Sequence, residues 1–218
     1  MTLALVERGA AGPAERLLVL LPGFGDEPDL FADHLDAIDP LRRWHVAVAR
    51  PPVVTDEGPA WFTVGDDGPE PAQLAAGIEA LGSTLTDLTT RLAVGADALV
   101  LGGYSQGGAM ALAALLDPTL SVRPTGVAAL AAYLPHREAA QDRALAEGHP
   151  LLIAHGADDD VVDPLLGRSA AKALHRAGAV VTWAEVDGDH RLGAPLLDEL
   201  RGWLDAVADG DTPSAPAA

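Results

Sequence analysis

Short apolar segments alternate with longer amphipathic segments along most of the chain, and turns rich in Gly and Pro separate them. This alternation predicts β–α units, which fold into a mostly parallel sheet flanked by helices. Several apolar segments lack polar alternation, as expected for strands that are covered on both faces. The expected strands are Leu3–Val6, Leu17–Leu21, His45–Ala49, Ala98–Leu101, Gly126–Leu130, Leu151–His155 and Val180–Val186. The expected helices are Leu30–Ile38, Gln73–Val94, Gln106–Leu116, Leu165–Ala177 and Ala194–Ala208.

Two segments do not follow this alternation. Arg50–Pro71 is rich in proline and contains the adjacent aromatics Trp61 and Phe62, so we expect a long ordered loop, a kind of segment that often serves function. Asp209–Ala218 is composed mainly of Ala, Pro and Asp, and we expect a flexible tail. We expect residues 1–208 to form a single domain. The sequence contains no internal repeat.

Composition narrows the classes of function. The chain has 218 residues, of which 49% are hydrophobic, enough for one domain with a substantial core. Acidic residues number 32 against 14 basic ones, a net charge of -18, which argues against a nucleic-acid partner and against stable association with anionic membranes. The chain has no cysteine, which excludes disulfides, thiolate metal sites and a cysteine nucleophile. Without a signal-peptide pattern or an apolar run of about 20 residues, we expect a cytoplasmic protein.

The strongest chemical motif is Gly103-Tyr104-Ser105-Gln106-Gly107, between an expected strand and an expected helix. A serine on such a tight strand-to-helix turn has its hydroxyl exposed above the sheet, where it can act as a nucleophile. The turn is crowded, and the flanking glycines relieve the crowding. The alternative is an ordinary Gly-rich turn without chemistry.

A serine hydroxyl needs a base to take its proton, and in this kind of fold the base and its acid follow the serine along the chain. The downstream histidines are His136, His149, His155, His175 and His190. His190 lies in a polar loop after the last expected strand, at the sheet edge where ligand chemistry gathers, so it is the expected base. His155 ends a strand, and we expect it to order its own loop.

The acid is expected in the loop after Leu151–His155. Asp158, Asp159 and Asp160 all lie there, and position alone does not separate them. Asp163 precedes Pro164 and is expected to cap the following helix.

An ester-cleaving serine also needs two backbone N–H groups to hold the oxyanion. Gln106, directly after the serine, is expected to supply one. The loop Gly23-Phe24-Gly25 after the second expected strand is expected to supply the other, from the N–H of Phe24, because its glycines let the backbone approach the serine.

These segments resemble the small carboxylesterase/phospholipase family of α/β-hydrolases, which includes acyl-protein thioesterases. The resemblance extends from about Leu17 to Leu204 and is carried by Leu20–Asp26, Ala60–Phe62, Gly103–Leu112, Gly126–Pro135, His155–Val162 and Asp189-His190. In the family's acid loop the Asp stands four residues after the His, which selects Asp159. The chain departs from the family pattern at Pro22, where members usually have His.

The resemblance implies an α/β-hydrolase fold with little or no cap, and hydrolysis of carboxylic esters or thioesters of small to medium acyl groups. Ser105 would be the nucleophile, His190 the base and Asp159 the acid, with no metal or organic cofactor. We expect Trp61, Phe62, Tyr133 and Leu134 to wall the substrate pocket, although core packing is the alternative. The expected partner is a small-molecule ester, and the expected state is a monomer or homodimer. A lactone hydrolase, a perhydrolase or a non-catalytic binding protein on the same fold remain alternatives.

Overall fold

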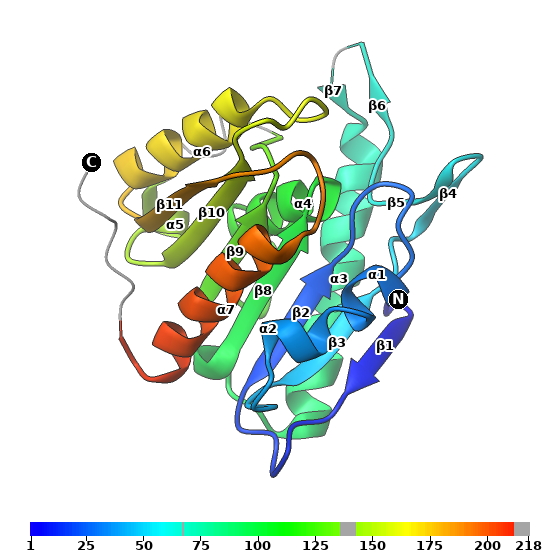
Figure 1. Ribbon diagram of the computed structural model, residues 1–218. Coiled ribbons are helices and arrows are strands. Elements are labelled where there is room, and N and C mark those ends of the chain that lie inside the picture. Colours follow the sequence, from blue (N-terminus) through cyan, green and yellow to red (C-terminus); the bar gives the residue numbers. More distant parts are fainter. Residues whose placement is uncertain (67, 136–142, 212–218) are drawn as a thin grey trace.

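A computed structural model describes residues 1–66, 68–135 and 143–211 and contains a central seven-stranded sheet (Figure 1). The strand order is β1-β3-β2-β8-β9-β10-β11, in which only the edge strand β1 runs antiparallel to its neighbour. The strands are β1 (Leu5–Arg8), β2 (Leu17–Leu21), β3 (His45–Ala49), β8 (Leu99–Tyr104), β9 (Gly126–Leu130), β10 (Pro150–Gly156) and β11 (Val180–Val186). All seven expected strands are therefore present in one sheet, and the predicted α/β-hydrolase fold is confirmed.

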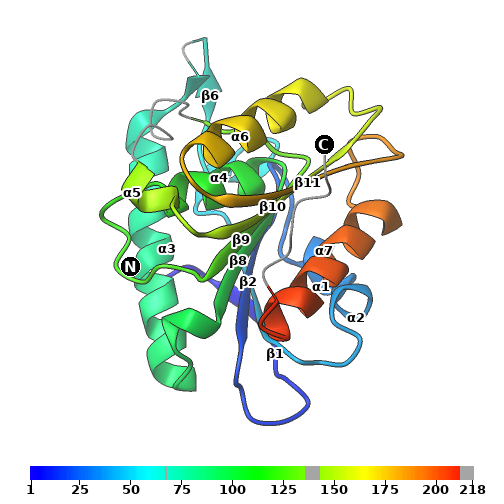
Figure 2. The same cartoon turned by 90° about the vertical axis from the view of Figure 1, so that its left-hand side faces the viewer.

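Helices cover both faces of the sheet, as Figures 1 and 2 show. The helices are α1 (Asp29–Ala32), α2 (Leu35–Ile38), α3 (Pro71–Leu92), α4 (Gln106–Leu115), α5 (Arg143–Ala146), α6 (Pro164–Arg176) and α7 (Ala194–Ala208), with a 3-10 turn at Ala96–Ala98. One core joins the sheet to α3, α4 and α6, and the other joins it to α1, α2 and α7. Strand β2 supplies both cores, because its successive side chains point to opposite faces and all five are buried.

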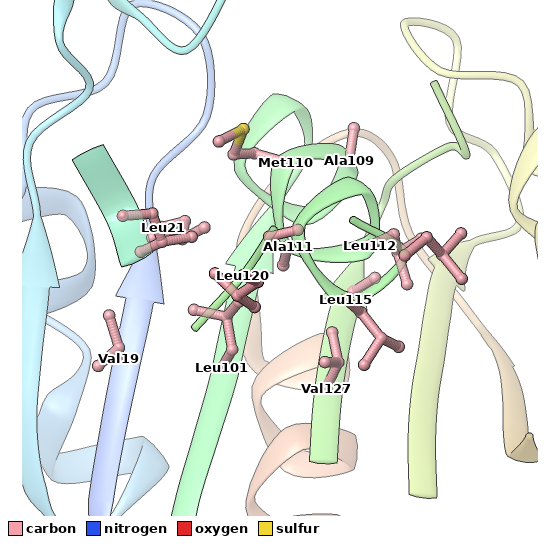
Figure 3. Close-up of a cluster of buried hydrophobic side chains, with 14 of the residues drawn as sticks. Val19, Leu21, Leu101, Ala109, Met110, Ala111, Leu112, Leu115, Leu120 and Val127 are labelled. Carbon is pink, nitrogen blue, oxygen red and sulfur yellow. The ribbon is translucent and has the colours of Figure 1, made fainter. Parts of the chain in front are cut away.

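Helix α4 carries the residues that follow the nucleophile motif, and it is almost wholly buried. Figure 3 shows Ala109, Ala111, Leu112 and Leu115 of α4 above the strands β2, β8 and β9. The small side chains of this helix let it pack closely on the sheet. The position of Ser105 at the start of α4 is thereby fixed by the core.

Two expectations differ from the structure. The helix expected at Leu30–Ile38 is two short helices, α1 and α2, interrupted at Asp33 and His34, which are weak helix formers. The loop expected at Arg50–Pro71 contains two small antiparallel pairs, β4 (Val53–Thr55) with β5 (Gly58–Ala60), and β6 (Val64–Gly65) with β7 (Gly68–Pro69). Gly58 and Gly68 have φ of 120° and 104°, which only glycine adopts readily and which lets the chain reverse within so few residues.

The boundary of the domain stays a prediction. Helix α7 ends at Ala208, and most of the expected tail, from residue 212 onward, lies outside the described residues. In the part of the chain that the structure describes, every helix is too short or too polar to cross a membrane.

Candidate active site

Ser105 occupies a strained turn between β8 and α4. Its φ of 52° and ψ of -119° are uncommon for any residue other than glycine, and such strain persists only where the surroundings enforce it. The backbone N–H of Ser105 donates to the carbonyl oxygen of Leu130 at 2.8 Å, so the next strand holds the turn in place. The hydroxyl is thereby presented at the carboxyl edge of the parallel strands, where ligand sites form in such sheets.

The two glycines of the motif are required by close backbone contacts. A Cβ on Gly103 would lie 2.3 Å from the carbonyl carbon of Gly107, and a Cβ on Gly107 would lie 2.0 Å from the carbonyl oxygen of Leu21. No side chain fits at either distance. The spacing seen in the sequence is therefore a steric requirement of the turn.

His190 lies in the loop between β11 and α7 and connects Ser105 to Asp159. Its Nε2 is 2.9 Å from the Ser105 Oγ, and its Nδ1 is 2.7 Å from the Asp159 Oδ2. Because a carboxylate only accepts hydrogen bonds, Nδ1 carries the proton and Nε2 is left to accept the serine hydroxyl proton. Of the other downstream histidines, His149 precedes β10, His175 lies within α6, and His136 lies outside the described residues.

The side chain of Asp159 is fully buried and its oxygens are saturated with hydrogen bonds. Oδ1 accepts the backbone N–H groups of Val161 at 3.0 Å and Val162 at 2.8 Å. Burial raises the pKa of the Asp159 carboxyl, but the hydrogen bonds from His190, Val162 and Val161 outweigh it, so the net pKa is lowered. The carboxylate is thus held ionised opposite the imidazole.

The other acidic residues of this loop are not paired with His190. Asp158 and Asp160 are exposed. The Oδ1 of Asp163 accepts the N–H of Leu165 at 2.8 Å, which caps α6 as expected. Only Asp159, of the four, is brought to His190.

His155 is a second histidine on the same acid, a contact that the sequence analysis did not predict. Its ring is fully buried, and its Nε2 lies 2.8 Å from the carbonyl oxygen of Val162 and 3.1 Å from the Asp159 Oδ2. Because the carbonyl oxygen accepts, Nε2 carries the proton and donates it to Val162, and the same nitrogen lies within ion-pair distance of the Asp159 carboxylate. The expected ordering of its own loop is present, and the four-residue spacing to Asp159 is the signal that could have indicated the second contact.

Tyr104 also supports His190 and was missed as a functional residue. Its hydroxyl donates to the carbonyl oxygen of His190 at 2.9 Å, and the two ring centroids are 5.3 Å apart. Burial raises the pKa of the Tyr104 phenol, so the hydroxyl remains a donor. The residue before the nucleophile therefore helps to hold the base.

The two expected oxyanion donors flank Ser105. The N–H of Phe24 and the N–H of Gln106 donate no hydrogen bond to any partner within the described residues. Gln106 is the first residue of α4, where the backbone N–H groups have no acceptor within the helix and carry partial positive charge. Both groups are therefore free to receive a developing negative charge.

Trp61 and Phe62 were expected to wall the pocket, and the structure corrects this interpretation. Both side chains are fully buried in the core, and neither lines the cavities beside Ser105. Their backbone is bound by the side chain of Gln106, whose Oε1 accepts the N–H of Trp61 at 2.8 Å and whose Nε2 donates to the carbonyl of Phe62 at 2.7 Å. The Trp61 indole donates to the carbonyl of Pro22 at 2.8 Å. Trp61 and Phe62 therefore contact the residues around Ser105 through buried hydrogen bonds to Gln106 and Pro22.

Two cavities of about 460 Å³ each meet at Ser105 and share Phe24. The first, which we name the hairpin cavity, is lined by Phe24, Thr55, Glu57, Thr63, Val64, Ser105, Gln106 and Tyr133. The second, which we name the histidine cavity, is lined by Phe24, Asp26, Leu30, Tyr104, Ser105, Val161, His190, Arg191 and Leu192. Tyr133 thus lies in a wall as expected, whereas Leu134 lines a separate cavity of about 300 Å³ between α3 and α4. Among the described residues, no group of three or more His, Asp or Glu side chains could hold a metal ion.

Comparison with known proteins agrees with this geometry. Residues 3–207 match the family model described as Phospholipase/Carboxylesterase, which confirms the resemblance expected from the sequence. The chain is 28% identical to the esterase YpfH of Escherichia coli, over 87% of this chain and 83% of that one. It is 26% identical to acyl-protein thioesterase 1 of Candida albicans, over 76% and 79%. The crystal structure of esterase PE8 superposes with a TM-score of 0.80 at 26% identity, covering 95% of this chain and all of that one.

The side chain of Gln106 gives a test of the scaffold. Gln106→Ala should lower the free energy of unfolding by about 1–3 kcal/mol, because it leaves the buried N–H of Trp61 and carbonyl of Phe62 without partners. Gln73→Ala is the matched control, since Gln73 accepts from Thr63 at an exposed position and its loss should cost less than about 0.5 kcal/mol. Urea unfolding measures both. If both variants lost the same free energy of unfolding, the stabilising role assigned to the buried hydrogen bonds of Gln106 would be wrong.

Proposed function

Because the chain belongs to the phospholipase/carboxylesterase family, an esterase and thioesterase family of α/β-hydrolases, we propose that it cleaves its substrates through an acyl-enzyme on Ser105. The observation that supports this most is the continuous hydrogen-bond chain from Ser105 through His190 to Asp159, at 2.9 and 2.7 Å. The substrates we propose are carboxylic esters and thioesters of small to medium acyl groups. The proposed hydrolysis uses no metal and no organic cofactor.

In the acylation step, the Oγ of Ser105 bonds to the carbonyl carbon while its proton moves to the Nε2 of His190. The carbonyl oxygen becomes an oxyanion, which the N–H groups of Phe24 and Gln106 stabilise. The bond to the leaving oxygen or sulfur then breaks, and the leaving group takes the proton from Nε2. Asp159 keeps the imidazole in the required tautomer and stabilises its positive charge.

In the deacylation step, water takes the place of the leaving group. Nε2 of His190 removes a proton from this water, whose oxygen bonds to the acyl carbon. The bond to Oγ then breaks, Nε2 returns the proton to Ser105, and the carboxylic acid departs. One ester bond and one water are consumed, and one acid and one alcohol or thiol are formed.

The two cavities suggest where each part of the substrate binds. The leaving atom must come within hydrogen-bond distance of the Nε2 of His190, so we assign the leaving group to the histidine cavity. The acyl group then extends into the hairpin cavity, beside Phe24, Val64 and Tyr133. A volume of about 460 Å³ there suits a small to medium acyl chain.

Removal of the nucleophile tests the proposal. Ser105→Ala should fold normally but hydrolyse p-nitrophenyl butyrate on the order of 10³-fold more slowly or worse, because no acyl-enzyme can form. Ser121→Ala, which changes a serine near Thr86 on the surface, should keep full activity. A fluorophosphonate should label the wild-type protein at Ser105, as located by peptide mass spectrometry. If Ser105→Ala retained most of the activity, the proposed nucleophile would be wrong.

The pH profile tests the base. His190 must be unprotonated at Nε2 to accept the serine proton, so kcat/KM should fall on the acid side, where the imidazole gains a second proton. Since the pKa of Asp159 is lowered, its carboxylate stays ionised there, and the acid limb should contain one ionisation. Circular dichroism at each pH would establish that the fold is intact. Activity unchanged down to about pH 4 would exclude this role for His190.

His155 is a positioning residue for Asp159 and can be tested as such. His155→Leu removes the donor to the Val162 carbonyl and the polar ring nitrogen beside Asp159, so kcat should fall on the order of tenfold while KM changes little. His155→Gln keeps an N–H donor at a similar distance from the backbone and should restore part of kcat. Steady-state kinetics on both variants measure this. Equal loss in the two variants, or a change confined to KM, would refute the positioning role.

A further inference from the structure

The histidine cavity contains a carboxylate that the proposed mechanism does not use. Asp26 lies in the loop that supplies the Phe24 N–H and is half-buried in the wall of this cavity. A Cβ built on Gly23 would lie 2.7 Å from the Asp26 Oδ2 and 3.4 Å from the Ser105 Cβ. The carboxylate and the nucleophile therefore both lie close to Gly23, on the side where a side chain would project.

The Asp26 carboxylate has no cationic partner among the described side chains. It accepts a hydrogen bond from the backbone N–H of Gly23, and it takes part in no ion pair within the described residues. Arg191 lines the same cavity, but its side chain is 84% exposed and pairs with Asp189 at 3.4 Å. Burial raises the pKa of the Asp26 carboxyl and outweighs the lowering by the Gly23 backbone and by His190, so the net pKa is raised. A half-buried carboxylate of this kind is stabilised when a cation enters the cavity.

Aromatic rings lie in the same wall. Phe24, which is 41% exposed, and Tyr104 both line the histidine cavity with Asp26. An aromatic face attracts a cation through its quadrupole, most strongly a quaternary ammonium group that carries no hydrogen-bond donor of its own. The cavity thus combines a carboxylate and two rings on the side of Ser105 where His190 delivers the proton.

We propose that the histidine cavity is a leaving-group subsite for a cationic alcohol or thiol, with Asp26 as its specificity-determining residue. This inference rests on the proposed function, since it needs an ester or thioester bond cleaved at Ser105. In the bound substrate, the ammonium group lies beside Asp26 while the leaving oxygen or sulfur faces the Nε2 of His190. The acidity of the chain, with a net charge of -18, favours approach of the same cationic substrates.

The test uses two thioesters of nearly equal shape. Acetylthiocholine and S-(3,3-dimethylbutyl) thioacetate differ in the positive charge of the leaving group, and released thiol is measured for both. Asp26→Asn keeps an oxygen that can accept the Gly23 N–H but removes the charge. The ratio of kcat/KM for the cationic to the neutral substrate should fall on the order of tenfold in Asp26→Asn relative to wild type. Comparing ratios removes the intrinsic reactivity of each substrate, which is the same for both proteins.

Asp29→Asn is the matched control. Asp29 is an exposed acid of the first turn of α1, three residues away and outside the cavity wall, and its loss removes the same formal charge. The ratio should stay at the wild-type value in this variant. A ratio that fell equally in both variants would mean that general surface charge, and not the subsite, selects the cation, and the proposal would be overturned.

Other outcomes separate this inference from the proposed function. If Asp26→Asn slowed both thioesters equally, Asp26 would act only on the oxyanion loop and the subsite would be refuted. If wild type cleaved p-nitrophenyl butyrate but neither thioester, inhibition of that reaction by choline and by 3,3-dimethylbutanol would give the same comparison without turnover, and equal inhibition would refute the subsite. If p-nitrophenyl butyrate were not cleaved either and Ser105 were not labelled by a fluorophosphonate, the proposed function itself would fail.

Discussion

The buried carboxylate of Asp159 is the group on which the rest of the site depends. A charge removed from water must be met by hydrogen bonds, and here the backbone of Val161 and Val162 and the imidazole of His190 supply them, while the Nε2 of His155 lies 3.1 Å from the Oδ2. The backbone donors come from the loop after β10, and the imidazole of His190 comes from the loop after β11. The loops after β10 and β11 are therefore held together by the same carboxylate that orients His190.

Ser105 is held by a separate set of contacts, mostly steric. The elbow closes only because Gly103 and Gly107 let the backbone of β8, α4 and β2 approach within distances that exclude any side chain. Gln106 then ties this elbow to the segment of Trp61 and Phe62. The nucleophile turn and the base are joined by two hydrogen bonds of 2.9 Å, one from the Ser105 hydroxyl to the Nε2 of His190 and one from the Tyr104 hydroxyl to the His190 carbonyl oxygen.

The sequence predicted the sheet and the elbow because both follow from local patterns. Buried parallel strands are continuous apolar runs, and the Gly-x-Ser-x-Gly spacing is imposed by steric crowding within five residues. It did not separate Asp159 from Asp158 and Asp160, because a turn decides which of three adjacent acids points inward, and only the family resemblance did so. Trp61 and Phe62 were placed wrongly because exposure depends on tertiary packing. The place of Asp26 in the cavity could not be predicted, since the wall is completed by Tyr104 of β8, by Val161 and by the loop after β11, all far from Asp26 in the sequence.

Acylation of Ser105 during turnover is the step on which the proposed function depends. Mixing the protein with p-nitrophenyl acetate, quenching in acid within the first turnover and mapping the peptides by mass spectrometry tests it directly. We expect an acetyl group on the peptide that contains Ser105, formed together with the first equivalent of p-nitrophenol and lost at the rate of steady-state turnover. An acetyl group on another residue, formed and lost at those rates, would contradict it.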